Sequence, residues 1–162
     1  MLFRSNPTAQ LRILDIRKID GLITPKDKFY AIQHHDRPEV NGDSYRLKVG
    51  GMVNKPSDFS LADLKAMPAT EVVAGYECSG NSPRLVQGLA SCGRWKGVRL
   101  STLLKKIGVH ADAREVVFFG TDRGMQDIVF RQDTYKLEQQ FARSMTLENA
   151  MKPEPLVAYS LN

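Results

Sequence analysis

The chain has 162 residues, of which 42% are hydrophobic and 25% are charged, and such a length suits one globular domain of about 100–200 residues. Its 23 Lys and Arg residues against 18 Asp and Glu give a net charge of +5, but the two signs are interspersed, which argues against a nucleic-acid surface. The sequence has no apolar window near the ~20 residues that a membrane span needs, and residues 1–20 lack the pattern of a signal peptide.

The first half of the chain mixes short strands with one capped helix. An alternating run at residues 45–49 predicts a strand. Ser60 is a suitable N-cap for a helix over residues 61–67, where the apolar side chains fall on one face. A second apolar strand is predicted at residues 72–76, and an irregular stretch at residues 77–94 follows it.

The second half repeats this mixture. A helix is predicted at residues 100–107, with Gly108 as the residue that ends it. Strands are expected at residues 115–119, 127–130 and 156–161, a single helical turn at residues 147–151, and an irregular stretch at residues 122–125. Short strands mixed with short helices predict an α+β domain, and the irregular stretches are where we expect a functional site.

Cys78 lies two residues after the end of the strand predicted at residues 72–76. The small residues behind it, Ser79 and Gly80, allow backbone amides to approach a bound group closely. A thiolate in such a place is a soft metal ligand or a nucleophile. Judged from spacing alone, however, a single cysteine at a strand end is more often a buried small hydrophobic residue.

Cys92 lies fourteen positions after Cys78, so the chain has no C-x-x-C pair. A zinc site of the two cysteines with His34 and His35 can be drawn, but its spacing matches no usual pattern. We therefore expect Cys92 to pack beside Trp95. The motifs of dinucleotide sites, nucleoside triphosphate sites and common hydrolases do not occur.

The run Glu77-Cys78-Ser79-Gly80-Asn81 resembles the motif of the sulfite oxidase family of molybdopterin oxidoreductases. The resemblance continues through further blocks in the family's order: Phe29-Tyr30 and Gln33-His34 before the motif, then Trp95-x-Gly97-Val98, Arg143-Ser144 and residues 156–162 after it. It covers residues 22–162, and the sulfane and sulfite dehydrogenases are the most similar branch.

The resemblance implies a molybdopterin cofactor and a set of residues that hold it. Cys78 is implied to be both the molybdenum ligand and the catalytic residue. The residues implied to contact the pterin are Gln33, His34, Ser79, Gly80, Asn81, Thr121 and Asp122. The last two lie in a stretch, residues 120–124, that looks like a loop of the family; taken alone, it would be a simple glycine turn.

The activity implied is two-electron oxygen-atom transfer on a small oxyanion or another sulfur-containing substrate. A separate haem c protein is the implied electron acceptor, because the chain has no C-x-x-C-H motif. The resemblance also implies a dimer and a periplasmic location; with no signal peptide in this chain, the alternative location is the cytoplasm. Sulfite itself is not predicted, because Ile32 and Pro83 stand where sulfite-oxidising members carry arginines.

The resemblance covers only the N-terminal part of the family's molybdopterin-binding domain. The family continues with a His-x-x-Pro-x-Arg segment that binds the pterin phosphate and with a C-terminal dimerisation domain, and neither occurs in this sequence. We therefore expect residues 1–162 to form an incomplete domain. Two alternatives remain open: a non-catalytic binding or structural protein without cofactor, and an enzyme that uses Cys78 as nucleophile with His34 as base.

Overall fold

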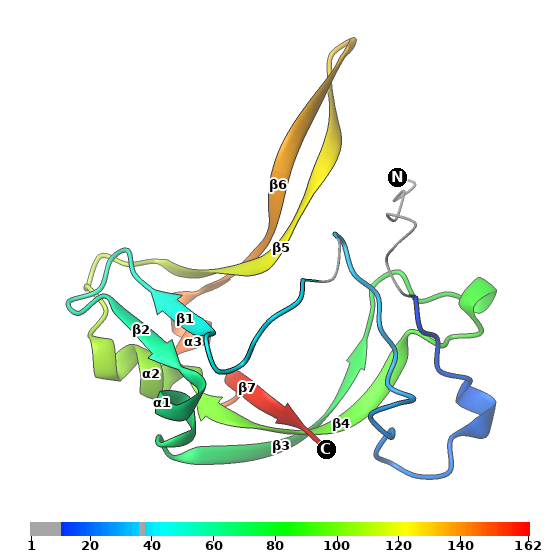
Figure 1. Ribbon diagram of the computed structural model, residues 1–162, viewed down its shortest axis with the longest axis horizontal. Coiled ribbons are helices and arrows are strands. Elements are labelled where there is room, and N and C mark those ends of the chain that lie inside the picture. The colour runs from blue at the N-terminus through cyan, green and yellow to red at the C-terminus, as the bar shows by residue number, and fades with distance from the viewer. Residues whose placement is uncertain (1–10, 36–37) are drawn as a thin grey trace.

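A computed structural model describes residues 11–35 and 38–162. It confirms the α+β class, with strands joined by short helices (Figure 1). The strands are β1 (Arg46–Val49), β2 (Ser57–Ser60), β3 (Ala69–Glu77), β4 (Ala90–Arg99), β5 (Glu115–Phe130), β6 (Asp133–Thr146) and β7 (Leu156–Leu161). The helices are α1 (Leu61–Lys65), α2 (Leu100–Ile107) and α3 (Leu147–Ala150), with short 3-10 turns at Ile16–Lys18 and Pro83–Leu85.

The helices begin and end where local sequence signals place them. Ser60 caps α1, because its hydroxyl accepts the Asp63 N–H at 3.1 Å and the Asp63 carboxylate accepts the Ser60 N–H at 2.8 Å. The helix ends two residues earlier than predicted, because the ring of Pro68 disfavours a helical backbone at the residue before it. For α2 the predicted bounds are confirmed, and Gly108 ends it with φ 71°.

The strands form three antiparallel sheets: β1 with β2, β3 with β4 and β7, and β5 with β6. The prediction of an irregular stretch at residues 77–94 was wrong over its last part, where β4 begins at Ala90. Residues 122–125 were also wrongly expected to be irregular, since β5 runs through them. The register of β5 against β6 nevertheless shifts between Phe119 and Arg123.

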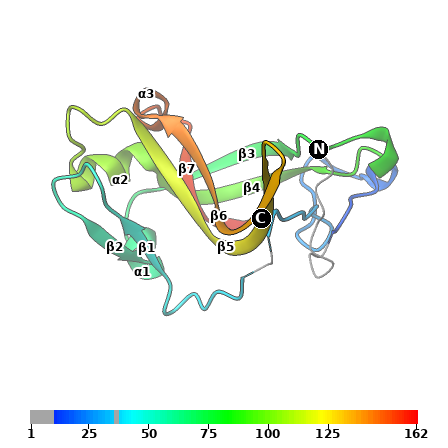
Figure 2. The same ribbon diagram turned by 90° about the horizontal axis from the view of Figure 1, so that it is seen from above.

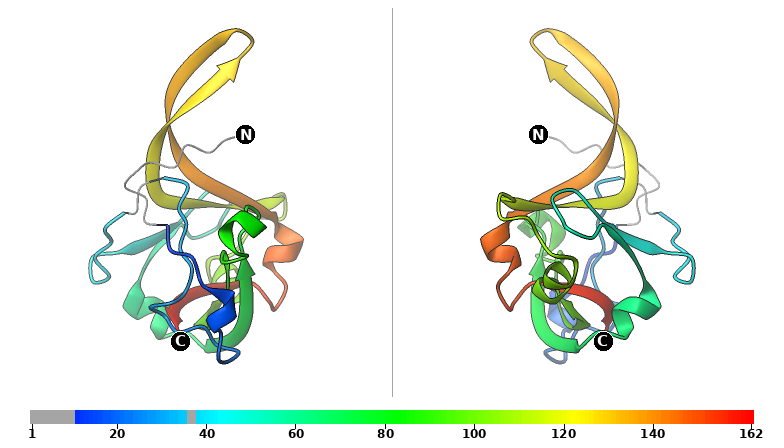
Figure 3. Two further views of the ribbon diagram at one scale, coloured as in Figure 1. Left: turned by 90° about the vertical axis from the view of Figure 1, so that its right-hand side faces the viewer. Right: turned by 90° about the vertical axis from the view of Figure 1, so that its left-hand side faces the viewer.

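The main hydrophobic core lies at one end of the β3–β4–β7 sheet, where the helices gather (Figures 1 and 2). Helix α2 supplies much of it, because its apolar side chains recur at helical spacing. The buried members are Phe59, Leu64, Val98, Leu100, Leu103, Leu104, Ile107 and Ala150. The β5–β6 ribbon extends away from this core, as both views in Figure 3 show.

The N-terminal segment completes the other end of the sheet. Strand β7 pairs with β4 only from Trp95 to Arg99, which leaves one edge of residues 90–94 without a strand partner. Thr24 lies along this edge: its N–H donates to the Cys92 carbonyl at 2.7 Å, and its hydroxyl accepts the Cys92 N–H at 3.1 Å. The prediction that residues 1–20 lack a signal peptide falls partly on residues 1–10, which are outside the described residues.

Candidate cofactor site

Cys78 lies one residue past the end of β3, as predicted. The last paired residues of β3 and β4 are Glu77 and Ala90, and the Cys78 N–H extends the ladder by donating to the Leu89 carbonyl at 2.9 Å. The side chain is partly exposed. Cys78 is therefore held by a strand pair on one side while its sulfur remains within reach of solvent.

A tight turn after Cys78 orients its sulfur. The Asn81 N–H donates to the Cys78 carbonyl at 2.9 Å, and the Gly80 N–H donates to the Cys78 sulfur at 3.4 Å. A Cβ added at Gly80 would meet only that sulfur, at 3.8 Å. Gly80 thus leaves an open face beside the sulfur, and Ser79 in the same turn is exposed.

The Asn81 side chain is directed into the loop that carries Cys78. Its amide nitrogen donates to the Glu77 carboxylate and to the Gln87 carbonyl, each at 3.1 Å, and its oxygen accepts the Leu89 N–H at 3.0 Å. These bonds connect the end of β3 with the residues that lead into β4.

His34 lies against the β5–β6 ribbon. Its ring hydrogen-bonds the Gln126 side chain and lies 5.5 Å from the Phe141 ring and 4.6 Å from that of His35, measured between centroids. Burial lowers the pKa of His34 below its ordinary value, and His35 and Arg143 add to this shift. The neutral imidazole is favoured as a result.

The same part of the ribbon carries Thr121 and Asp122. They lie within the register shift of β5, so the predicted loop is an irregularity inside a strand. The Gly120 carbonyl there accepts a hydrogen bond from the Gln140 side chain at 2.5 Å, and a Cβ at Gly120 would lie 2.1 Å from the Asp122 carboxylate. Asp122 acts on the charge of His34, which places these two predicted residues near each other.

The segment from Tyr30 to His35 connects the Cys78 loop with the ribbon. Burial raises the pKa of Tyr30, and the charge of Cys78 contributes to the shift. At the other end of the segment, His35 packs against Gly124 of β5, where an added Cβ would lie 2.5 Å from the imidazole. Between them, the side-chain oxygen of Gln33 is buried and has no hydrogen-bond partner among the described residues.

Several neighbours of these residues were missed by sequence reasoning. Gln126, Phe141 and Arg143 contact or influence His34 although they lie about a hundred positions away. Of these, only Arg143 appeared in a family block, and Gln126 carries no local signal at all. Tyr30 could have been found from the family segment that contains it.

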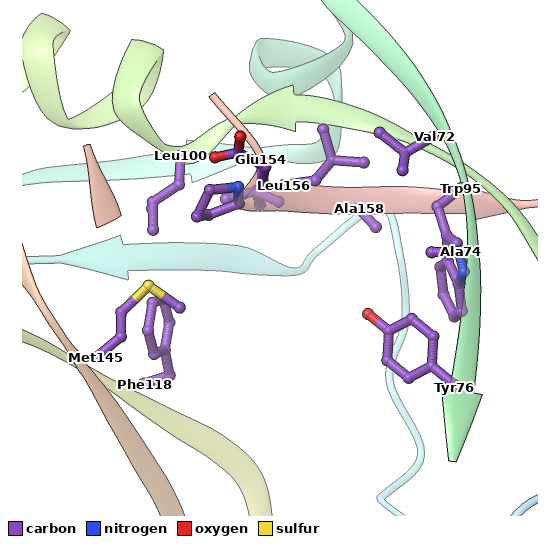
Figure 4. A pocket seen from close by; sticks show the side chains of 12 residues that line it. Val72, Ala74, Tyr76, Trp95, Leu100, Phe118, Met145, Glu154, Leu156 and Ala158 are labelled. Carbon is purple, nitrogen blue, oxygen red and sulfur yellow. The ribbon is translucent and has the colours of Figure 1, made fainter. Parts of the chain in front are cut away.

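A separate cavity lies elsewhere in the molecule. Its volume is about 400 Å³, and it separates the β3–β4–β7 sheet from the base of the ribbon. Figure 4 shows Phe118 and Met145 on one side and Tyr76 with Trp95 on the other. Cys78 and His34 do not line it, and its apolar walls offer few groups for a charged cofactor.

Within residues 11–35 and 38–162, no three His, Cys, Asp or Glu side chains gather in a way that could hold a metal ion. A metal at Cys78 would accordingly need most of its ligands from a cofactor rather than from the described part of the protein. The described residues also include no helix that is both long and apolar enough to cross a membrane.

Comparison with known proteins identifies the family. The family described as the oxidoreductase molybdopterin binding domain matches residues 34–162. The chain belongs to this family. Its cofactor is therefore molybdopterin, and the predicted relationship to sulfite oxidases is confirmed.

Individual relatives agree with this assignment. The sulfite oxidase of Arabidopsis thaliana is 28% identical over 89% of this chain and 40% of its own length. The mitochondrial sulfite oxidase of Rattus norvegicus is 31% identical over 88% of this chain and 27% of its own length. The NADH nitrate reductase of Ulva prolifera is 26% identical over 91% of this chain and 18% of its own length.

A solved structure shows the same fold. The sulfane dehydrogenase SoxCD from Paracoccus pantotrophus superimposes with a TM-score of 0.77 at 24% identity, over 98% of this chain and 39% of that one. The chain thus spans less than half the length of each of these relatives, and of this matched structure.

The described residues fit a molybdopterin in their chemistry. Cys78 offers a soft sulfur with open space beside it, as molybdenum requires. The buried Gln33 oxygen has no donor among residues 11–35 and 38–162, and a heterocyclic N–H would supply one. A neutral His34 beside Asp122 adds further polar groups for the same ring system.

Proposed function

We propose that this chain holds a molybdopterin through Cys78 and contributes to oxygen-atom transfer on a small sulfur-containing or oxyanion substrate. The observation that carries the proposal is the partly exposed Cys78 sulfur, oriented by the Gly80 N–H beside an open face. The cofactor, when bound, supplies the two-electron redox chemistry of molybdenum. The protein supplies one soft ligand and the polar groups around it.

We assign the pterin contacts to both ends of the segment from Tyr30 to His35, at the β5–β6 ribbon and at the Cys78 loop. Gln33 and His34 would bind the polar heterocycle together with Thr121 and Asp122, because, against the effect of burial, the Asp122 carboxylate raises the pKa of His34. The backbone of Ser79 and Gly80 would lie against the cofactor near the metal. Asn81, also predicted as a contact, would act from the same turn.

The names of the relatives support a sulfur-containing substrate, since both sulfite oxidases and a sulfane dehydrogenase match. Nitrate is the alternative oxyanion, because a nitrate reductase matches over most of this chain. A separate haem protein would accept the electrons, and a dimer would follow the family. Residues 1–162 would form the N-terminal part of the cofactor domain.

A non-catalytic binding protein is the second candidate function. The β5–β6 ribbon favours it, because Phe119 and Val129 are 67% and 70% exposed. Apolar surface of this kind often marks a contact with another protein segment.

Replacing the two cysteines separately tests the ligand assignment. The protein would be purified from a host that makes molybdopterin, and molybdenum per chain would be measured by mass spectrometry. We expect the wild type to contain measurable molybdenum. Cys78→Ser should reduce this to background, because a hydroxyl is a harder ligand that ionises poorly.

Cys92→Ser is the matched control, since Cys92 is also free and partly exposed but lies within β4. It should retain the molybdenum content of the wild type. Equal molybdenum in wild type and Cys78→Ser would refute the assignment. A folded wild type without any molybdenum would favour the non-catalytic function.

A further inference from the structure

The side chain of Asn81 joins the two ends of the loop between β3 and β4 by hydrogen bonds. The Asn81 amide bonds to Glu77 on the β3 side and to Gln87 and Leu89 on the β4 side. The carbonyl of the same residue, Leu89, accepts the Cys78 N–H. The Asn81 oxygen therefore satisfies the backbone N–H of the same residue that holds Cys78 in place.

The loop also contains strained backbone. Val86 and Gln87 have φ angles of 48° and 56°, a left-handed conformation that is unfavourable for residues other than glycine. Gln87 is held in this conformation by two bonds: its N–H donates to the Ser82 carbonyl at 3.1 Å, and its carbonyl accepts from Asn81. Strain of this kind persists only where surrounding contacts maintain it.

The outside of the loop is packed against the N-terminal segment. The Leu14 N–H donates to the Gly88 carbonyl at 2.9 Å, and a Cβ at Gly88 would lie 2.0 Å from the Ile13 side chain. These contacts hold the outer backbone of the loop but do not reach the turn that contains Cys78. Among the hydrogen bonds described, those of the Asn81 side chain connect that turn to the strained residues.

We propose that Asn81 is a positioning residue for Cys78. Its amide keeps the loop closed, and the closed loop keeps the Cys78 sulfur in contact with the Gly80 N–H. The inference rests on the proposed function in one respect: a positioned sulfur matters because Cys78 is the proposed metal ligand. The position itself can be measured without any cofactor.

Two substitutions remove the hydrogen bonds of the Asn81 side chain to different extents. Asn81→Ala removes all three side-chain bonds and leaves the Leu89 N–H without its acceptor. Asn81→Asp keeps an oxygen for that N–H but loses both donated bonds and places a carboxylate beside Glu77. The loop should open further in the alanine variant than in the aspartate variant.

Alkylation of the two cysteines by iodoacetamide measures this opening. The full chain would be labelled for increasing times, and mass spectrometry of its peptides would give a separate rate for Cys78 and Cys92. We expect Asn81→Ala to raise the Cys78 rate severalfold, because the wild-type sulfur is only partly exposed and lost hydrogen bonds multiply the open population. Asn81→Asp should give a smaller increase, and Cys92 should keep its rate in both.

Asn149→Ala is the matched control. This substitution removes the side-chain amide of Asn149 on α3, whose oxygen accepts a hydrogen bond from the Lys152 ammonium group at 2.7 Å. The alkylation rates of both cysteines should therefore stay unchanged. An unchanged Cys78 rate in Asn81→Ala would overturn the proposal. So would an equal rise for both cysteines, which would indicate general loosening of the sheet.

If circular dichroism shows that Asn81→Ala does not fold, the aspartate variant decides by the same criterion. Molybdenum content of the same variants keeps the two proposals apart. A wild type without molybdenum would contradict the proposed function but leave the alkylation result intact. Normal alkylation in Asn81→Ala would contradict only the positioning role.

Discussion

The β3–β4–β7 sheet and the β5–β6 ribbon both carry residues of the candidate site, but they are held in different ways. The sheet is held by residues far away in sequence: the backbone N–H of Tyr30 donates to the Ser91 hydroxyl at 3.0 Å, and the Asn162 side chain accepts from the Arg94 N–H and donates to the Thr24 carbonyl. The ribbon is held mainly by its own ladder, from the Glu115 and Thr146 pair to the Phe130 and Asp133 pair. Long-range contacts thus determine where Cys78 lies, whereas register determines where Asp122 lies.

Replacing Gly97, at the contact between two strands of the sheet, should have a large effect on stability. A Cβ at Gly97 would lie 2.2 Å from the Val157 carbonyl oxygen, which belongs to the backbone of β7. Gly97→Ala must therefore push β7 away from β4, and we expect a loss of about 3 kcal/mol in the free energy of unfolding. Chemical denaturation would measure it.

Gly75→Ala is the control for this prediction. Gly75 lies on β3 of the same sheet, and a Cβ there would meet nothing within 4 Å. The free energy of unfolding of Gly75→Ala should differ from that of the wild type by less than about 1 kcal/mol, since alanine is tolerated in a strand as well as glycine or slightly better. Similar losses in the two variants would mean that the close contact of β4 with β7 does not limit stability.

Removing the Asn162 side chain should have an intermediate effect. Its oxygen accepts the Arg94 N–H at 2.9 Å, and its amide donates to the Thr24 carbonyl at 2.7 Å. Losing both bonds should cost about 1–3 kcal/mol of unfolding free energy. Thermal or urea denaturation of Asn162→Ala would show the loss.

The backbone of Asn162 has φ 61°, so alanine adds a conformational cost of its own. Asn162→Gly lacks the same bonds but accepts this conformation freely. A glycine variant as stable as the wild type would show that the two bonds contribute nothing and that the sheet is less dependent on distant residues than we infer.

A substitution on the ribbon should have the smallest effect. Phe130 is 60% exposed near the tip, so Phe130→Ala should change the free energy of unfolding by no more than about 0.5 kcal/mol. Phe59→Ala, at a side chain only 6% exposed in the core, should cost about 3–5 kcal/mol. A loss above about 1 kcal/mol for Phe130→Ala in denaturation experiments would show that the tip is packed against something other than its own ladder.

The parts of the fold that the sequence predicted are those with local causes. The Ser60 cap, the apolar face of α2 and Gly108 at its end all act within a few residues. By contrast, β4 was missed at its start, because Ala90 to Arg94 has no clear alternation and becomes a strand only beside β3 and Thr24. The long β6 was missed as well, since its many polar residues lie on an exposed ribbon.

For the site, the sequence by itself determined the family, the cofactor class and the position of Cys78 at the end of a strand, because these depend on a contiguous motif and a local apolar run. Only the tertiary structure decided that His34 contacts Gln126, that Asp122 lies in a register shift, and that Asn81 closes the loop around Cys78. These contacts join segments that are separated in the chain or depend on backbone conformation. Residue spacing in the sequence cannot predict these contacts, because they form only when the strands pair.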